Sequence, residues 1–397
     1  MKTHIDLLHS ISKKKQRRII GLMSGTSLDG LDIAVCLLTG SGKGTGFTLE
    51  NFKTVNYDTD LKREILSIFS RKDADLEKVC LLNEWIATRN AQMINECLSE
   101  WNLEPSNVDL IASHGQTIYH APKHLHRDSK FENATLQIGD GDHLAIKTGI
   151  ITISDFRQKH VAAGGEGAPL AAYGDFILFG DPHADTILLN IGGIANFTFL
   201  PSDKSDQAFF STDVGPGNTM MDAWMQKNFP GKYFDEDAAV AKKGTVSKSL
   251  LKALCDNSFF ALPFPKTTGP ELFSLKYLDT AIKKTNNESL DVYDVMATLN
   301  TFTATVICDS IQMIPNKSTE LEILLSGGGM HNPMVRDHIR QHIPGVTITS
   351  TATKNINPDA KEAILFAILA NECIAGNAST FSRLFPNISM GKISLPG

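Results

Sequence analysis

Three short glycine-rich segments follow apolar stretches of the chain, a placement that suits phosphate binding. Glycine at the end of a strand allows positive φ and lets the backbone come close to a ligand. Phosphate oxygens are best met by several backbone N–H groups, so such turns favour a nucleotide site. One turn of this kind can also be an ordinary connector, but three in one chain favour binding. The candidate residues are Gly25, Thr26, Ser27, Leu28, Asp29, Gly30, Leu31, Asp32, Asn190, Gly192, Gly193, Gly327, Gly328 and Gly329.

Other nucleotide-binding signatures are incomplete or missing in the sequence. It contains no G-x-x-x-x-G-K-[ST] segment, which excludes a P-loop. No G-x-G-x-x-G segment opens a helix after a strand, so a dinucleotide-binding fold has no support. The set of H-R-D and D-F-G segments that marks a protein kinase is incomplete, because D-F-G does not occur. A nucleotide site would therefore be built from turns between strands.

Two carboxylates stand where acid–base chemistry is expected in an α/β protein. Asp213 ends the strand-like residues 208–212 and precedes a turn that leads into a helix. Active sites of such folds lie at the carboxyl ends of strands, although an aspartate there can also be a simple helix cap. Glu362 lies early in an apolar helix, where it would favour the helix dipole even without a function. Asp213 is therefore the stronger candidate.

Three further polar residues are candidates for binding a substrate. His114 follows a compact strand and is either a substrate-orienting or a hydrogen-bonded structural histidine. Asp155 and Arg157 are two residues apart near the expected junction of the two halves. An arginine suits a carboxylate, because its guanidinium can donate two parallel hydrogen bonds. The same pair can equally form an ion pair between domains.

Composition and charge restrict the partners. A net charge of -6 and a pI near 6.1 give no field that favours nucleic acid or an anionic membrane surface. No apolar run approaches the roughly 18 residues of a membrane span. The six cysteines lie far apart, without C-x-x-C or paired Cys/His spacing, which disfavours a structural zinc site or a disulfide framework. We expect a cytoplasmic protein in a reducing compartment, whose partners are small molecules.

The predicted elements alternate between strands and helices, which favours an α/β fold. Three strand-like segments with tight links predict an antiparallel meander, and apolar spacing predicts a long helix over residues 75–101. A second cluster of strands begins near residue 186. The two clusters predict two related lobes, residues 1–158 and 159–374, with about residues 375–397 packing back on the first lobe.

Several motifs, in order along the chain, resemble those of one enzyme family. Residues 21–32, G-L-M-S-G-T-S-L-D-G-L-D, are similar to the opening of anhydro-N-acetylmuramic acid kinases almost word for word. Several such matches in the right order are highly specific. Further matches are S-H-G-Q-T at 113–117, Q-I-G-D at 137–140, D-F-R at 155–157, G-G-E-G-A-P-L at 164–170, L-N-I-G-G-I-A-N at 189–196, D-V-G-P-G-N at 213–218 and M-D-A-W at 221–224.

The resemblance implies a fold and a reaction. The fold would be two actin-like ATPase (ribonuclease H-like) lobes around a central cleft, with the glycine turns holding ATP. The reaction would open the 1,6-anhydro ring of anhydro-N-acetylmuramic acid with water and phosphorylate O6, using ATP and Mg²⁺. The product would be N-acetylmuramic acid 6-phosphate, in peptidoglycan recycling. The resemblance also suggests a homodimer.

The resemblance assigns roles to residues already singled out. Asp213 matches the family's catalytic base, and Glu362 matches a position that helps to hold the sugar and the attacking water. His114, Asp155 and Arg157, together with the turn at Gly165 and Glu166, are expected to contact the sugar. Met23 and Asn190 stand where the broader superfamily often has aspartates. Asp29 and Asp32 are near the first turn and could help to hold the metal, whose ligands stay unassigned.

Other departures leave two alternatives open. Pro270 stands where the family usually has an arginine, and Glu166 where a glutamine is common. A kinase of the same fold acting on another amino sugar would explain the missing arginine. A non-catalytic sensor of ATP or sugar is the second alternative, and the retention of Asp213 and of all three glycine turns speaks against it.

Overall fold

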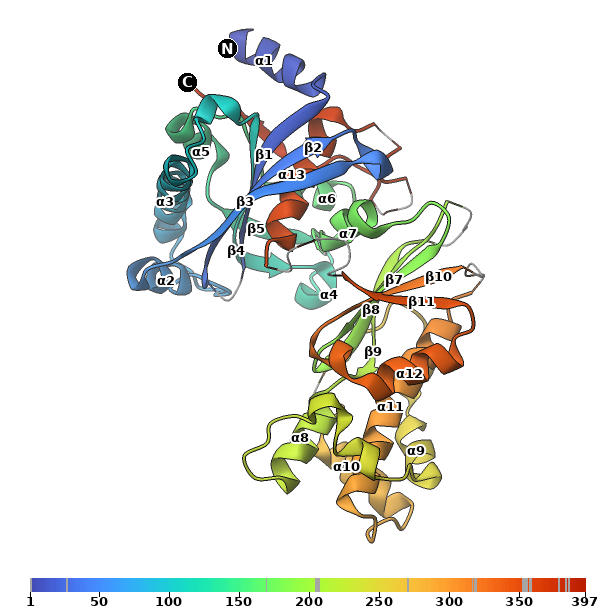
Figure 1. The fold of residues 1–397 in the computed structure, drawn as a ribbon. Helices are drawn as coiled ribbons and strands as arrows, with labels where there is room; N and C mark the ends of the chain where they lie inside the picture. The colour runs from blue at the N-terminus through green and yellow to red at the C-terminus, as the bar shows by residue number, and fades with distance from the viewer. Residues whose placement is uncertain are drawn as a thin grey trace. The chain divides into compact units, whose positions relative to one another are not determined.

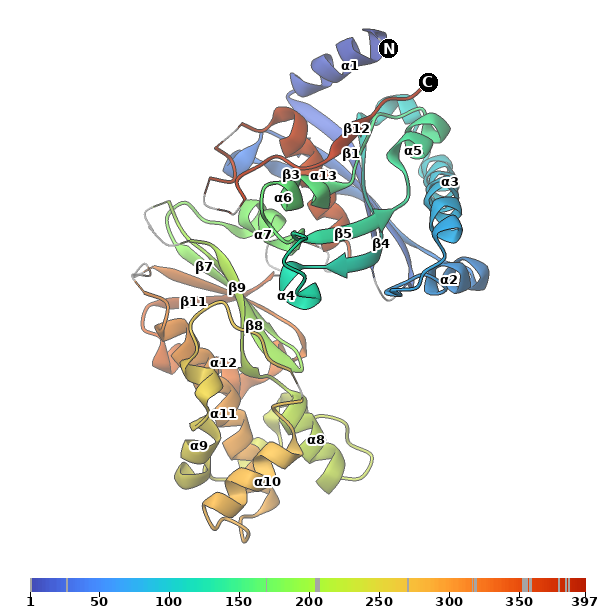
Figure 2. The ribbon, with the colours of Figure 1, turned by 180° about the vertical axis from the view of Figure 1, so that it is seen from behind.

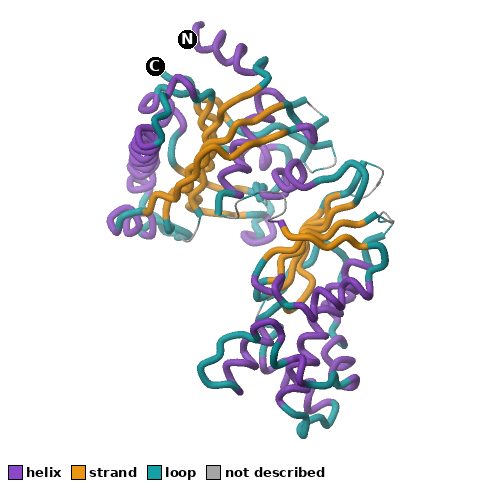
Figure 3. Tube along the Cα trace, in the orientation of Figure 1, coloured by secondary structure: helices purple, strands orange, loops and turns teal. Residues whose placement is uncertain are grey.

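The chain forms two compact units, each built on its own sheet. Unit 1 comprises Met1–Leu178 and Asn357–Gly397, and unit 2 comprises Phe179–Ile356. Figure 3 shows the strands gathered in two separate sheets with helices around each. This computed structural model describes residues 2–25, 28–168, 170–203, 208–269, 271–315, 317, 320–351, 356, 359–377, 379–382, 384 and 386–397.

The sheet of unit 1 combines an antiparallel meander with a parallel part. The strand order is β12-β6-β4-β1-β2-β3, and β5 pairs with β4 outside this path. β1, β2 and β3 pair antiparallel, which confirms the predicted meander. β4 lies parallel to both β1 and β6, so the carboxyl ends of these three strands meet at one edge. The strands are β1 (Gln16–Ser24), β2 (Gly30–Thr39), β3 (Gly46–Asn56), β4 (Leu110–Ala121), β5 (Ala134–Ile138), β6 (Thr152–Ser154) and β12 (Lys392–Ser394).

Helices cover both faces of this sheet. In Figures 1 and 2, α3 and α5 lie on one side of the sheet, and α13 lies on the other side with α6 and α7. The long predicted helix is confirmed as α3, which begins after Asp75 because the Asp75 side chain accepts a hydrogen bond from the Glu77 N–H. The helices are α1 (Lys2–Ser12), α2 (Thr59–Leu66), α3 (Leu76–Glu100), α4 (Lys123–His126), α5 (Gly141–Thr148), α6 (Phe156–Ala162), α7 (Ala171–Phe179) and α13 (Lys361–Ala375), with short 3-10 turns at Gly42–Gly44 and Pro105–Asn107.

Strand β1 contacts helices on both faces of the sheet, because successive side chains of a strand point in opposite directions. Ile20 and Leu22 are buried in the apolar cluster formed with α3. Gly21, between them, contacts α13: a Cβ on Gly21 would lie 1.9 Å from the carbonyl oxygen of Ala363. Glycine at this position therefore lets α13 rest directly on the backbone of β1.

Unit 2 repeats the arrangement of a meander followed by parallel strands. Its strand order is β11-β10-β7-β8-β9. β7, β8 and β9 are antiparallel neighbours, while β10 runs parallel to β7 and β11. The sheets of both units, with their helices, confirm the predicted α/β class. The strands are β7 (Asp185–Ile191), β8 (Ile194–Leu200), β9 (Phe210–Pro216), β10 (Leu321–Ser326) and β11 (Val346–Ser350).

The helices of unit 2 enclose two apolar clusters. One cluster joins the sheet to α11 and α12, and the other lies among α8, α9, α10 and α11. Because α11 is buried along most of its length, it contributes to both clusters. The helices are α8 (Thr219–Asn228), α9 (Lys248–Cys255), α10 (Leu275–Lys284), α11 (Val292–Gln312) and α12 (Pro333–His342), with 3-10 turns at Glu236–Ala238, Ala241–Lys243, Ser258–Ala261 and Gly328–His331.

The compact units differ from the expected lobes at both points where the chain passes from one unit to the other. The first crossing follows Leu178 instead of residue 158, because α6 stays in unit 1 through Phe156, whose ring packs 5.3 Å from that of Phe366. The second precedes α13, which packs on β1, β2 and β4 of unit 1. The final residues also lie in unit 1, where β12 pairs antiparallel with β6. Among the described residues, no helix has both the length and the apolar composition that a membrane crossing requires.

Candidate active site

The first glycine turn joins β1 to β2 in unit 1. The Gly25 carbonyl accepts hydrogen bonds from the Leu28 N–H and from Nε2 of Gln116, each at 3.4 Å. Leu28 has a left-handed φ of 58° and a buried side chain, so it anchors the turn in the core. Thr26 and Ser27, the expected hydroxyl donors, lie outside the described residues. In the described part of the turn, the left-handed conformation therefore falls on Leu28 and not on a glycine.

The start of β2 carries the two aspartates expected near the turn. A side chain at Gly30 would lie 2.4 Å from a carbonyl oxygen of β3, so only glycine fits there. Leu31 is buried in the core, which makes its side chain a packing residue. Asp29 is exposed, whereas Asp32 is partly buried and accepts a 2.6 Å hydrogen bond from Oγ1 of Thr54. Burial raises the pKa of Asp32, and the charge of Asp29 adds to the effect.

The second glycine turn, between β7 and β8, is bonded to the start of α8. The Gly193 carbonyl accepts from the N–H groups of Gly217 and Thr219, at 2.9 and 3.2 Å. The Gly192 carbonyl accepts from the Asn218 N–H at 2.8 Å. These bonds hold the turn against the segment that leads from β9 into α8.

The third glycine turn packs against the end of β7, so the two turns of unit 2 meet. Gly327 has a φ of 78°, and a Cβ there would lie 2.5 Å from Oδ1 of Asn190. A Cβ on Gly329 would lie 2.3 Å from Cγ2 of Ile191. Gly328 is the open member, with its nearest neighbour at 3.8 Å. Close contacts explain the glycines at 327 and 329, whereas Gly328 has room for a Cβ.

A cavity of about 560 Å³ lies beside this third turn, entirely within unit 2. Burial raises the pKa of Asp222 on its wall. The ring of Phe234, which also lines the cavity, is 59% exposed. The lining residues are Asn218, Met221, Asp222, Phe234, Asp235, Glu236, Asp237, Gly328, Gly329, His331 and Asn332.

Asp213 lies in β9 and is held by a segment that precedes α10. Its N–H donates to the carbonyl of Lys266, and its Oδ2 accepts from the Thr268 N–H, both at 2.9 Å. Within the described residues, Oδ1 accepts no hydrogen bond. Since Asn218 is the N-cap residue of α8, Asp213 is not the helix cap that the sequence left open. The carboxylate is half-buried, oriented through one oxygen and available through the other.

Lys266, which belongs to the same segment, binds backbone carbonyls of the protein itself. Its ammonium group donates to the carbonyls of Phe259 and Phe260, at 3.1 and 2.9 Å, and lies 4.7 Å from the ring centre of Phe259. Burial lowers the pKa of this lysine. Pro270, the departure from the family pattern, lies outside the described residues.

In unit 1, His114, Arg157 and Glu362 come together. Nε of Arg157 donates to Nε2 of His114 at 3.0 Å. Burial lowers the pKa of Arg157, and the charge of Glu362, in the first turn of α13, opposes that shift. Glu362 itself is exposed. The structure therefore groups two expected sugar-binding residues with the second candidate carboxylate.

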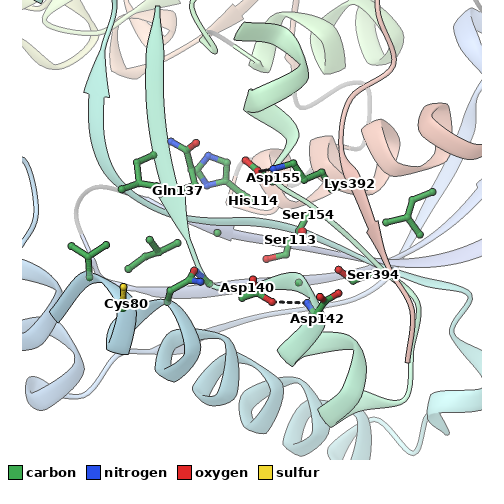
Figure 4. Close-up of a pocket in the computed structure, with 18 residues that line it drawn as sticks. Cys80, Ser113, His114, Gln137, Asp140, Asp142, Ser154, Asp155, Lys392 and Ser394 are labelled. Atoms are coloured by element: carbon green, nitrogen blue, oxygen red, sulfur yellow. Dashed lines mark hydrogen bonds and ion pairs between the residues drawn. The ribbon is translucent and has the colours of Figure 1, made fainter. Parts of the chain in front are cut away.

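Asp155 is not paired with Arg157. Its Oδ2 instead accepts from Nζ of Lys392, on the C-terminal strand β12. Both residues line a cavity of about 500 Å³ beside the middle of β4 and the carboxyl end of β6, which also includes His114 and Gln137 (Figure 4). The sequence pointed to Asp155 but not to Lys392, because nothing local marks a partner so distant along the chain.

Gly165 and Glu166 lie in different surroundings. A Cβ on Gly165 would lie 2.2 Å from the ring of His160, so close packing explains this glycine. Glu166 is exposed, and one of its carboxylate oxygens lies 3.1 Å from Nδ1 of His124. Asn218, which contacts both turns of unit 2, was not among the expected site residues. Asn218 could have been predicted from its position at the end of the D-V-G-P-G-N segment, just before a helix.

Comparison with known proteins identifies relatives along the whole chain. The family profile described as "Anhydro-N-acetylmuramic acid kinase" matches residues 17–383. A protein of that name from Pseudoalteromonas atlantica is 52% identical, with both chains covered completely. Another, from Caldanaerobacter subterraneus, is 37% identical over 98% of this chain and 100% of its own. A ROK family glucokinase from Streptomyces griseus, solved with glucose and AMPPNP, gives a TM-score of 0.31 at 12% identity, covering 88% of this chain and 98% of its own. The sequence matches alone carry the family assignment.

Proposed function

Because this chain belongs to the anhydro-N-acetylmuramic acid kinase family, we propose that it uses ATP to convert 1,6-anhydro-N-acetylmuramic acid into N-acetylmuramic acid 6-phosphate. The match to the family profile over residues 17–383 carries this proposal. The reaction would return a cell-wall sugar to metabolism, as expected of a peptidoglycan-recycling enzyme in the cytoplasm.

We assign the nucleotide to the glycine turns. In unit 2, the turn at Gly328 borders a cavity of about 560 Å³, within the roughly 300–1,000 Å³ of ordinary small-molecule sites. That cavity suits the nucleoside, and Gly192 and Gly193 lie against the first residues of α8, a helix whose N-terminus favours negative charge. In unit 1, the turn at Gly25 would supply backbone donors to the phosphates.

Mg²⁺ is the cation expected to accompany ATP. Among the described residues, no group of three His, Cys, Asp or Glu side chains could hold a metal ion. Mg²⁺ is commonly bound by one or two carboxylates together with substrate phosphates and waters, and Asp29 and Asp32 beside the first turn fit that need. When bound with ATP, the ion would offset negative charge on the phosphates.

Asp213 is the proposed general base. Its carboxylate would take a proton from water as the water oxygen bonds to the anomeric carbon and the bond from that carbon to O6 breaks. O6 would then bond to the γ-phosphorus while the bond between that phosphorus and ADP breaks. The hydrogen bond from the Thr268 N–H fixes one oxygen of Asp213 and leaves the other for the water. General-base assistance is typically worth about 10²–10⁴ in rate.

Unit 1 is proposed to bind the sugar. The partly buried guanidinium of Arg157 suits the lactyl carboxylate that distinguishes muramic acid from glucosamine. Glu362, close enough to affect the pKa of Arg157, would help to hold the sugar and the attacking water. His114, Asp155, Gly165 and Glu166 remain proposed contacts. Of these, Asp155 is already paired with Lys392 and His114 with Arg157.

Pro270 favours one second candidate, a kinase of the same fold that acts on another amino sugar. The family usually has an arginine at this position, and proline cannot replace any contact made by its charge. In a panel of amino sugars, the anhydro sugar would then be the poorest substrate.

The proposal is tested by incubating the protein with ATP, Mg²⁺ and the anhydro sugar in ¹⁸O-water. We expect a phosphorylated product that carries one ¹⁸O at the anomeric carbon, read early because a free anomeric centre exchanges. Asp213→Asn should lose the product while keeping an acceptor for the Thr268 N–H. Asp279→Asn, on the exposed face of α10, is the matched control and should act like the unchanged protein. Absence of any phosphorylated product from the unchanged protein would refute the proposal.

A further inference from the structure

The guanidinium of Arg157 is held at two points. Nε donates to Nε2 of His114 at 3.0 Å, and Nη1 donates to the carbonyl oxygen of Gly167 at 2.9 Å. The Gly167 peptide is fixed in turn, because its N–H donates to Nδ1 of His160 at 2.9 Å. Within the described residues, Nη2 of Arg157 donates no hydrogen bond. Two anchors therefore orient the planar fork and leave one end open.

His114 can act as an anchor only while it is neutral. An imidazole nitrogen accepts a hydrogen bond through a lone pair, which protonation removes. His114 is 2% exposed, and burial together with the charge of Arg157 lowers its pKa to about 3. With Nε2 accepting, the ring proton must reside on Nδ1. The ring is held in place by packing against Phe366, with 4.8 Å between the ring centres.

We propose that His114 is a positioning residue, whose neutral imidazole fixes Arg157 so that Nη2 is presented to the carboxylate of the sugar. This inference rests on the proposed function, which supplies that carboxylate. Because Nε of Arg157 already donates to the histidine, the guanidinium must bind an anion through its remaining N–H groups. A guanidinium that is already held in place also loses less conformational freedom on binding. Through Arg157, His114 thereby favours sugars that carry a carboxylate.

A purely structural histidine would give the same packing against Phe366, so the test must separate packing from hydrogen bonding. His114→Phe keeps an aromatic ring and removes the acceptor. His114→Gln places an amide oxygen near the position of Nε2 and restores an acceptor. His143→Gln, at a partly exposed position on α5, is the matched control for the second variant.

The readout is the ratio of kcat/KM for 1,6-anhydro-N-acetylmuramic acid to that for 1,6-anhydro-N-acetylglucosamine, which lacks the carboxylate. Hydrogen bonds to charged groups are worth enough that His114→Phe should lower this ratio on the order of 10- to 100-fold. His114→Gln should recover most of it, and His143→Gln should not change it. An unchanged ratio in His114→Phe, with phosphorylation intact, would overturn the inference and leave the proposed function standing.

A second measurement does not depend on turnover. In protein labelled with ¹⁵N-histidine, the His114 signals should report a neutral ring with its proton on Nδ1 from pH 5 to pH 8. A His114 that titrates near pH 6.5, or that carries its proton on Nε2, would overturn the inference. If the unchanged protein phosphorylates neither sugar, the proposed function fails, and this spectrum still decides whether His114 anchors Arg157.

Discussion

Gly21→Ala is the sharpest test of how α13 is placed on the sheet of unit 1. The new Cβ would lie 1.9 Å from the carbonyl oxygen of Ala363, where ordinary contacts begin at 3.4 Å, so α13 must recede by about 1.5 Å. Overpacking of this kind costs about 1–3 kcal/mol and occasionally more. For a domain of 150–250 residues, that corresponds to a fall in melting temperature of roughly 2–12 °C.

The same shift should reach the chemistry, because Glu362 directly precedes Ala363. A misplacement of about 1 Å can cost on the order of 10²-fold in rate, so kcat should fall by about that factor if Glu362 holds the sugar. Hydrogen exchange read by mass spectrometry should show faster exchange in α13. Gly44→Ala is the matched control, since a Cβ there has no neighbour within 4 Å. A Gly21→Ala protein with the melting temperature and α13 protection of the unchanged protein would refute this reasoning.

Three further predictions follow from other parts of the fold. Gly327→Ala should lower the melting temperature of unit 2 by several degrees, because a φ of 78° strains any residue other than glycine. Gly328→Ala should leave the melting temperature unchanged and raise KM for ATP about tenfold. Equal effects of the two substitutions would contradict the argument. Glu372→Gln removes a buried carboxylate whose charge acts on the buried Arg17. Urea unfolding should show that the free energy of unfolding falls by about 1–3 kcal/mol. An unchanged urea midpoint would contradict this prediction. The pKa of His114 is about 3 when folded, below the roughly 6.5 of the unfolded chain, so stability should fall as the pH drops below 6.5, by up to about 1.4 kcal/mol per unit. His114→Gln should flatten that slope in urea midpoints from pH 7 to pH 5, and an equally steep slope would refute it.

The sequence predicted those features that depend on local patterns. The meander of β1, β2 and β3 and the helix α3 follow from apolar spacing and tight links. The glycine turns were recognised because each closes an apolar strand. In each case the information lies within a few residues of the feature itself.

Other features depend on partners that are far apart in the sequence. Periodicity marks α13 as a helix but does not indicate which sheet it covers, and the small residue that decides this is Gly21. In the same way, Asp155 stood out in the sequence, but Lys392 lies more than two hundred residues away. The pairing of Arg157 with His114 was also hidden, because an arginine near an aspartate is ordinarily expected to pair with it.

The insertion of unit 2 within unit 1 has a consequence for how the protein is made. Unit 2 ends at Ile356, so a ribosome releases all of it before α13 and β12. The sheet edge at β6 and the face of β1 that α13 covers must therefore wait, uncovered, until the last residues emerge. The usual order, in which the amino-terminal domain folds first during synthesis, would be reversed here. A released chain truncated before residue 361 would hold all of the second unit and display an apolar surface suited to chaperone binding.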